Sequence, residues 1–388
     1  MSFFGWGGGG KGGGKSGKGG GYGRGGGTGG GRGGRGGDSQ PMAAADPAEV
    51  ADFDAAWASA TPLDEGHAGA WNGLGAALVG SAALSVVEKA PVLCANGETL
   101  YNRVEVRATA TELLFMCNGV PDYAPRKING GKVVESDWQG RCRSGRIDRN
   151  PNKIIAQDYR FRVPVAPGAP LATPITATPM GPIGIALNGV PLFHGDMQYT
   201  NPKLPNGLFA NQDESFDQCC GHPDGRGMYH YHQYPRCVVG ASALGLDAPD
   251  ALVAALKDDA DLTAAPLAKA LTEQIAKGEP SKCIGIAFDG IPIMGPVGIF
   301  DGEVRLARSS YVGELDTAKG NPVYVEGHGD LDACNGCTGA DGVWRYYATI
   351  RIEGDDVVPV FPYMIGAYRC QPVITNFPNH QRAKVTLG

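Results

Sequence analysis

Two eleven-residue stretches of the chain share one pattern, and this repetition limits the folds that the sequence can adopt. IGIALNGVPLF at 183–193 matches IGIAFDGIPIM at 284–294, 101 residues further on. Each stretch places an Asn-Gly or Asp-Gly pair between two apolar runs, which is the strongest short-range signal for a β-hairpin. The sequence therefore predicts two equivalent hairpins.

The similarity continues after each hairpin at a constant spacing of 115 residues. DQCCGH at 217–222 aligns with DACNGC at 332–337, and GMYHYH at 227–232 aligns with GVWRYY at 342–347. Each half thus holds a hairpin, an Asp-x-Cys sequence, a glycine-rich turn and an aromatic strand. We interpret these regions as two copies of one design, at about 180–240 and 283–370.

The rest of the chain surrounds this repeat with strand and helix patterns. Runs of β-branched and alternating residues, separated by Gly, Pro and Asn, predict strands over 92–240. An Ala/Leu-rich stretch at 245–277 predicts a helical insertion between the two halves. We expect a mainly β, sandwich-like or barrel-like body. The expected organisation is a tail at 1–40, short helices and a linker at 41–91, a β domain at 92–375 and a C-terminal tail at 376–388.

The N-terminal segment differs in composition from the body. Residues 1–37 hold 23 of the 61 glycines, six basic residues and no acidic residue. The whole chain carries −6, so the remainder carries −12 (−6 minus +6). Such a segment cannot bury enough apolar surface to fold, and a flexible tail is the simpler interpretation. The alternative is RNA binding through the RGG-like residues Arg24, Arg32 and Arg35.

Tyrosine and histidine alternate without a break at 229–232. Successive side chains of a strand point to opposite faces, so Tyr229 and Tyr231 would share one face. His230 and His232 would share the other, about 6.6 Å apart at Cα, which lets both imidazoles reach one metal ion. The tyrosines would pack on the core and anchor the strand.

A third histidine, His222, lies eight residues before His230. A turn with an odd number of residues would place it on the histidine face, whereas a four-residue turn would bring Cys219 opposite His232. We take His222, His230 and His232 as candidate ligands for zinc or copper(II), which both accept imidazole. Two alternatives stay open: a half-buried strand whose histidines meet solvent or hydrogen-bond locally, or an acid–base role for His230 or His232 without a metal.

The ten cysteines are an even number, which permits disulfides and favours an oxidising compartment. The N-terminus, however, lacks the apolar stretch typical of a signal peptide. The CxxC spacing of Cys334 and Cys337 also occurs in zinc and redox sites. The candidate bonds join Cys219 or Cys220 to Cys237, Cys334 or Cys337 to Cys370, and Cys117 to Cys142.

Several motifs in this order resemble those of the YHYH-domain family. The matching stretches are CNGVPDY (117–123), NPNKIIAQDYRFRVP (150–164), GPIGIALNGVPLF (181–193), DQCCGHPDGRGMYHYH (217–232), IGIAFDGIPIMGP (284–296), LDACNG (331–336) and FPYMIGAYRC (361–370). The resemblance implies a mostly β domain, often found in secreted or surface proteins, and no particular activity. Family members often carry a second Tyr-His-Tyr-His where this chain has WRYY at 344–347.

Three hypotheses follow. The first is a disulfide-stapled β protein, extracellular, at the cell surface or periplasmic, that binds one transition metal in a catalytic or structural role. The second is a non-enzymatic matrix or adhesion protein with the glycine-rich tail as a tether. The third is an RNA-associated protein that acts through the tail, which requires reduced cysteines.

Overall fold

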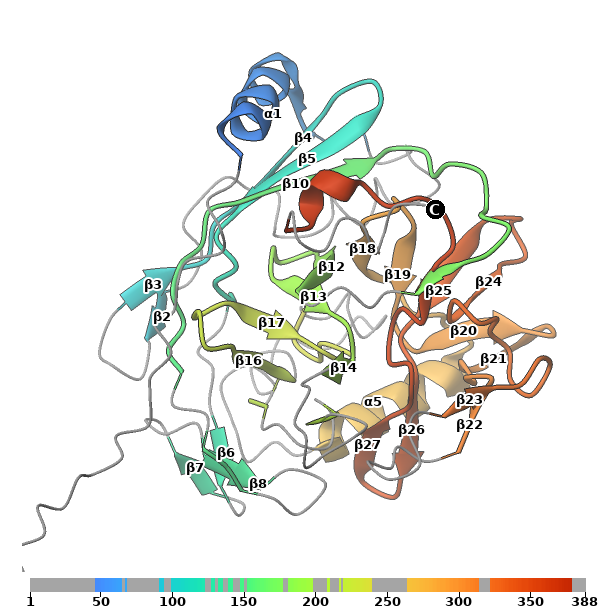
Figure 1. Ribbon diagram of the computed structural model, residues 1–388. Helices are drawn as coiled ribbons and strands as arrows, with labels where there is room; N and C mark the ends of the chain where they lie inside the picture. Colours follow the sequence, from blue (N-terminus) through green and yellow to red (C-terminus); the bar gives the residue numbers. More distant parts are fainter. Residues whose placement is uncertain are drawn as a thin grey trace, which may run out of the picture. The chain divides into compact units, whose positions relative to one another are not determined.

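The mainly β architecture expected from the sequence is confirmed by the computed structural model (Figure 1). The expected tail at 1–40 and the first part of the expected helical insertion, 245–263, lie outside the residues that the structure describes. The described residues are 46–64, 67, 91–93, 99–122, 127–129, 132–134, 139–141, 147–149, 152–176, 181–197, 208–209, 216–217, 219–238, 264–313 and 322–378.

The largest sheet has eight strands, and their order is the same on both sides of its centre (Figure 1). At the centre, β12 (Pro182–Ala186) pairs antiparallel with β18 (Cys283–Ala287). Each central strand pairs next with its antiparallel hairpin partner. That partner pairs with a parallel strand, which in turn pairs with an antiparallel strand at the edge of the sheet. These are β13 (Pro191–Phe193), β17 (Tyr229–Tyr231) and β16 (Gly221–Pro223) on one side, and β19 (Pro292–Met294), β25 (Trp344–Tyr347) and β24 (Gly336–Thr338) on the other.

The two central strands approach each other so closely that only glycine fits at two positions. A Cβ atom on Gly184 would lie 2.6 Å from the carbonyl oxygen of Ile286. A Cβ atom on Gly285 would lie 2.7 Å from the carbonyl oxygen of Ile185. These glycines belong to the IGIA sequence found in both matching stretches. The contact between the two strands therefore explains why each stretch has glycine there.

A second, four-stranded sheet packs against the same core. Its inner face contributes Phe115, Phe161 and Val163 to the cluster of buried residues that the eight-stranded sheet also fills. The rings of Phe161 and Phe288 lie 5.0 Å apart across the two layers. Two sheets that share one core form a sandwich-like body. The strands, in sheet order, are β1 (Thr61–Pro62), β4 (Val104–Ala108), β5 (Glu112–Cys117) and β10 (Tyr159–Pro164).

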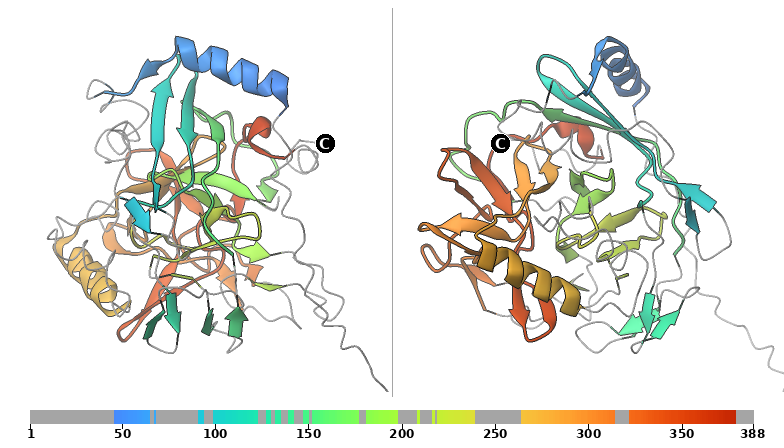
Figure 2. Two further views of the ribbon diagram at one scale, coloured as in Figure 1. Left: turned by 90° about the vertical axis from the view of Figure 1, so that its left-hand side faces the viewer. Right: turned by 180° about the vertical axis from the view of Figure 1, so that it is seen from behind.

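The helix α1 (Pro47–Ser59) covers the outer face of the four-stranded sheet (Figure 2). Asp46 caps its first turn by accepting a hydrogen bond from the amide of Ala48 at 2.9 Å, and proline occupies the first helical position. Phe53 is buried against Leu114 of β5. The helix is held by this apolar contact together with its local capping.

Part of the expected helical insertion is the helix α5 (Ala264–Lys277), which packs beside the hairpin of β26 (Ile350–Glu353) and β27 (Asp356–Pro359) (Figure 1). Short two-stranded sheets and a 3-10 turn complete the described structure. The paired strands are β2 (Pro91–Leu93) with β3 (Thr99–Tyr101), β6 (Lys127–Asn129) with β7 (Lys132–Val134), β8 (Gln139–Arg141) with β9 (Ile147–Arg149), β11 (Ile175–Thr176) with β28 (Ala367–Tyr368), β14 (Asp196–Met197) with β15 (Leu208–Phe209), β20 (Val297–Phe300) with β21 (Glu303–Leu306), β22 (Tyr311–Val312) with β23 (Val323–Tyr324), and β26 (Ile350–Glu353) with β27 (Asp356–Pro359); the turn is η5 (Ile374–Asn376).

Candidate metal centre

The β16–β17 hairpin, at one edge of the eight-stranded sheet, brings the three candidate histidines together. Pro223 pairs with Tyr229, so the turn between the strands consists of the five residues 224–228. This odd number places His222 directly opposite His230. The structure thus selects one of the two arrangements that the sequence left open.

The three imidazoles form one buried cluster. His222, His230 and His232 are 2%, 2% and 3% exposed, so they do not face solvent, whereas the local hydrogen bond that the same alternative expected is present between His230 and Met228. One ring nitrogen from each histidine lies within 4.8 Å of the others, close enough to hold one metal ion. The ring of Phe193 stacks on His230 at 3.8 Å between centroids, and the ring of Phe216 lies 4.7 Å from His222.

Backbone carbonyls fix the protonation of two of the rings. The Nδ1 atom of His230 lies 2.7 Å from the carbonyl oxygen of Met228, and the Nδ1 atom of His232 lies 2.7 Å from that of His194. A carbonyl oxygen only accepts, so both Nδ1 atoms carry the hydrogen and donate it. The two Nε2 atoms lie 2.8 Å apart. Either a second proton on one ring bridges them as a hydrogen bond, or both lone pairs bind one metal ion.

Burial shapes the electrostatics of this cluster. Removal from water, followed by the neighbouring His222, lowers the pKa of His230 well below its usual value, which favours the neutral imidazole that metals bind. Asp217 lies under the hairpin and accepts hydrogen bonds from the amides of Cys219 (2.9 Å) and Gly221 (3.0 Å). Burial raises the pKa of Asp217 to about 7 although these donors favour the charged form.

The tyrosines of the alternation anchor the hairpin in the core, on the face opposite the histidines. Tyr229 and Tyr231 are 1% and 0% exposed. The hydroxyl of Tyr229 donates to the carboxylate of Asp217, and the hydroxyl of Tyr231 accepts from the amide of Asn188 at 3.1 Å. Both polar tips therefore have partners inside the protein, as buried hydroxyl groups require.

Comparison with known protein families identifies the chain. A family model described as YHYH protein matches residues 160–354, half of the sequence, and this range contains the whole histidine hairpin. The chain belongs to the YHYH family. Comparison with curated proteins and with solved structures gave no match.

One disulfide closes the YHYH hairpin at its base. Cys219, two residues before β16, is bonded to Cys237, six residues after β17. The sequence had allowed either Cys219 or Cys220 as the partner of Cys237. In the structure Cys219 forms the bond and Cys220 is a buried thiol.

The other predicted disulfides need correction. Cys334, Cys337 and Cys370 are thiols in the structure, so the expected bond between Cys370 and one of the other two is not formed. The Sγ atom of Cys370 instead donates to the carbonyl oxygen of Gly168 at 3.2 Å. Cys117 is a buried thiol, and its predicted partner Cys142 lies outside the described residues.

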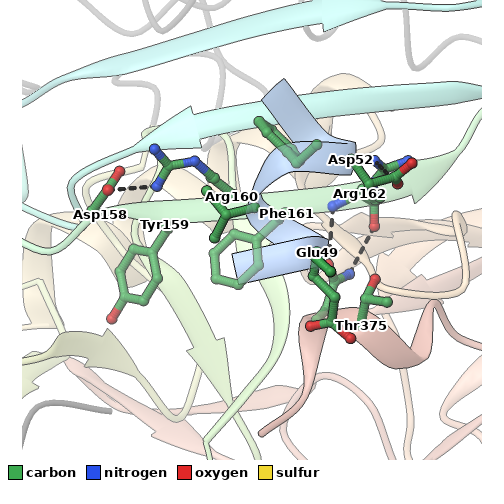
Figure 3. A pocket seen from close by; sticks show the side chains of 12 residues that line it. Glu49, Asp52, Asp158, Tyr159, Arg160, Phe161, Arg162 and Thr375 are labelled. Atoms are coloured by element: carbon green, nitrogen blue, oxygen red, sulfur yellow. Dashed lines mark hydrogen bonds and ion pairs between the residues drawn. The ribbon is translucent and has the colours of Figure 1, made fainter. Parts of the chain in front are cut away.

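A pocket of about 310 Å³ lies apart from the histidine cluster, between α1, β10 and η5 (Figure 3). Tyr159 and Phe161 project to the same side of β10 there, and the two neighbouring arginines also line the pocket. Arg160 is paired with Asp158 at 2.5 Å. Arg162 likewise forms ion pairs, so the cations of the pocket are already neutralised.

Several features of the YHYH site could not be found from the sequence. Phe193 reaches His230 because β13 pairs with β17, and this contact joins segments that are 37 residues apart. No sequence pattern marks Phe216 as part of the site, apart from its position beside Asp217.

The RNA hypothesis rests on Arg24, Arg32 and Arg35, which lie outside the described residues. Within the described part, no helix is long and apolar enough to cross a membrane.

Proposed function

We propose that this YHYH protein binds one transition-metal ion through the Nε2 atoms of His230 and His232 and a ring nitrogen of His222. The observation that carries the proposal is the 2.8 Å approach of two Nε2 atoms whose rings already donate their hydrogen from Nδ1. Two such rings repel each other unless a proton or a metal ion bridges their Nε2 atoms, and the third buried imidazole beside them supports the metal ion. The burial of all three histidines supports a tightly held ion.

The distance between the two Nε2 atoms favours copper(II) over zinc. With metal–nitrogen bonds of about 2.0–2.1 Å, a separation of 2.8 Å corresponds to an angle of about 84–89° at the metal. That angle is typical of the tetragonal geometry of copper(II), whereas tetrahedral zinc would separate the nitrogens by about 3.3 Å. The Cys219–Cys237 disulfide supports a location in an oxidising compartment, which would be extracellular, at the cell surface or periplasmic.

Elemental analysis of full-length protein, purified without a histidine tag and exposed to copper and zinc salts together, tests both parts of the proposal. We expect one equivalent of copper per chain, with an electron paramagnetic resonance spectrum of tetragonal nitrogen-ligated copper(II). Bound zinc with no copper would contradict the choice of metal. Protein that takes up neither ion would contradict the metal site itself.

Alanine at each ligand position tests the assignment of residues. We expect His222→Ala, His230→Ala or His232→Ala to weaken metal binding by at least about 100-fold, because loss of an outer-shell partner alone costs 10–100-fold. His328 is exposed and lies outside the cluster, so His328→Ala serves as the matched control and should bind normally. Normal binding by all three ligand variants, measured by competition titration, would show that the ligands are wrongly assigned.

A further inference from the structure

The only disulfide among the described residues encloses the complete ligand set of the candidate metal centre. All three histidines lie between Cys219 and Cys237, which are separated by 18 residues. Both cysteines are buried, at 0% and 2% exposure. A covalent closure of this length removes much of the freedom of the enclosed segment. The bond therefore limits how far the three imidazoles can move apart.

The other half of the large sheet shows what this hairpin looks like without a disulfide. There Gly336, Cys337 and Thr338 of β24 pair with the same register that β16 has, at the constant spacing of 115 residues. Cys334 occupies the position that matches Cys219, and it is a thiol. The hairpin forms there without the bond. Closure is thus unnecessary for the hairpin fold and occurs where the histidines do.

Backbone pairing holds the YHYH hairpin only weakly to the sheet. β16 lies at the edge, and β17 pairs with β13 through one residue pair, Leu192 with Tyr231. Chelation requires the Nε2 atoms of His230 and His232 to remain at bonding distance from one ion. A binding site that is already ordered binds more tightly because ordering costs less on binding. The disulfide supplies that order from the base of the hairpin.

We propose that the Cys219–Cys237 disulfide is a redox switch for the metal centre, an inference that rests on the proposed function. When the buried base of the hairpin opens, two molecules of a thiol such as glutathione cleave the S–S bond, which takes up two electrons and two protons to leave two thiols, while the two thiol molecules become one disulfide. The ligand segment then loses its closure and the ion is held less tightly. By reciprocity, bound metal makes the disulfide harder to reduce by the same factor.

The full chain with both Cys219→Ala and Cys237→Ala tests the first half of this coupling in the absence of reductant. We expect its dissociation constant for copper(II) to rise by about 10–100-fold, the range found when groups that orient ligands are lost. The matched control carries Cys334→Ala and Cys370→Ala, which removes two buried thiols from the other half and should bind as wild type does. Equal affinities in all three proteins would overturn the switch but leave the metal site standing. Failure of wild type to bind copper would instead overturn the proposed function.

Reduction of the wild-type disulfide in glutathione buffers, with free zinc held constant by a metal buffer, provides a second test that needs no variant. Zinc serves as the probe because thiols reduce copper(II). We expect saturating zinc to shift the reduction equilibrium toward the disulfide at least tenfold, or about 30 mV for two electrons, measured by alkylation of the thiols. No shift, or a shift toward the thiols because these bind the zinc, would overturn the proposal.

Discussion

Asp289 is a buried carboxylate whose surroundings favour its neutral form. It is 0% exposed and accepts hydrogen bonds from the hydroxyl of Tyr346 (2.7 Å) and the amide of Cys370 (3.2 Å). Burial nevertheless raises its pKa to about 6. Asn188 occupies the matching position of the other hairpin and is held by Tyr231, so an amide fits this type of turn.

We expect the Asp289 carboxylate to make the fold less stable as the pH rises. Between about pH 4 and pH 6 the native state holds a proton that the unfolded state has lost, so the free energy of unfolding falls with pH across this window. A shift of about 2 units corresponds to about 3 kcal/mol. Urea unfolding should show that the free energy of unfolding of wild type falls by about this amount from pH 4 to pH 7, relative to that of Asp289→Asn. A difference between the two proteins that does not change with pH would contradict the prediction.

The two edge hairpins, β16–β17 and β24–β25, have the same register but different surroundings. Gly227 and Gly342 lie at matching positions of their turns, and both have φ of +77°. A Cβ on Gly227 would lie 2.6 Å from the side chain of Ile155, whereas a Cβ on Gly342 would meet no atom within 4 Å. The turn of the YHYH hairpin thus packs against another part of the chain, and its counterpart faces open space.

Alanine at these two positions separates backbone strain from packing. We expect Gly342→Ala to cost about 1–2 kcal/mol, the price of a left-handed conformation for a residue with a Cβ. Gly227→Ala should cost about 1–3 kcal/mol more, because it also forces Ile155 to move. Thermal or urea unfolding of both variants measures the difference. Equal losses of stability in the two variants would show that the side chain of Ile155 can move aside at no energetic cost.

At the scale of the whole molecule, the eight-stranded sheet presents two equivalent edges, and only one of them carries the histidines. Cys337, Arg345 and Tyr347 stand where His222, His230 and His232 would fall at the 115-residue spacing. Cys337 pairs with Arg345, as His222 pairs with His230. Arg345 is a permanent cation held by the carboxylate of Asp341 at 2.6 Å, and it cannot act as a ligand.

We expect the triple change Cys337→His, Arg345→His and Tyr347→His to raise the metal content from one ion per chain to two. Cys337 is a thiol, so its replacement breaks no disulfide. The carbonyl oxygen of Val343 already accepts from Arg345 at 3.3 Å and would orient the new ring as Met228 orients His230. Elemental analysis gives the count, with Arg345→His alone as the control that should stay at one. A folded triple variant that still binds one ion would contradict the prediction.

Local sequence patterns determined much of the fold of this protein. The Asn-Gly and Asp-Gly pairs lie in the β12–β13 and β18–β19 hairpins, and Asp46 caps α1 as its position before Pro47 indicates. Strict alternation also placed the tyrosines and histidines of the YHYH stretch on opposite faces. These features follow from the geometry of a single strand, turn or helix end, so a short stretch contains all the information they need.

Only the tertiary structure decided how the metal centre is assembled. The five-residue turn that brings His222 opposite His230 is local, because the same turn forms at 339–343, where Gly342 meets no atom within 4 Å; its packing against Ile155, 72 residues away, is not local. The pairing of β13 with β17 supplies Phe193, and the disulfide joins Cys219 before the hairpin to Cys237 beyond it. The packing of the turn and the strand pairing each depend on contacts between segments that are far apart in the chain. Such contacts are set by packing of the whole core, and no local pattern encodes them.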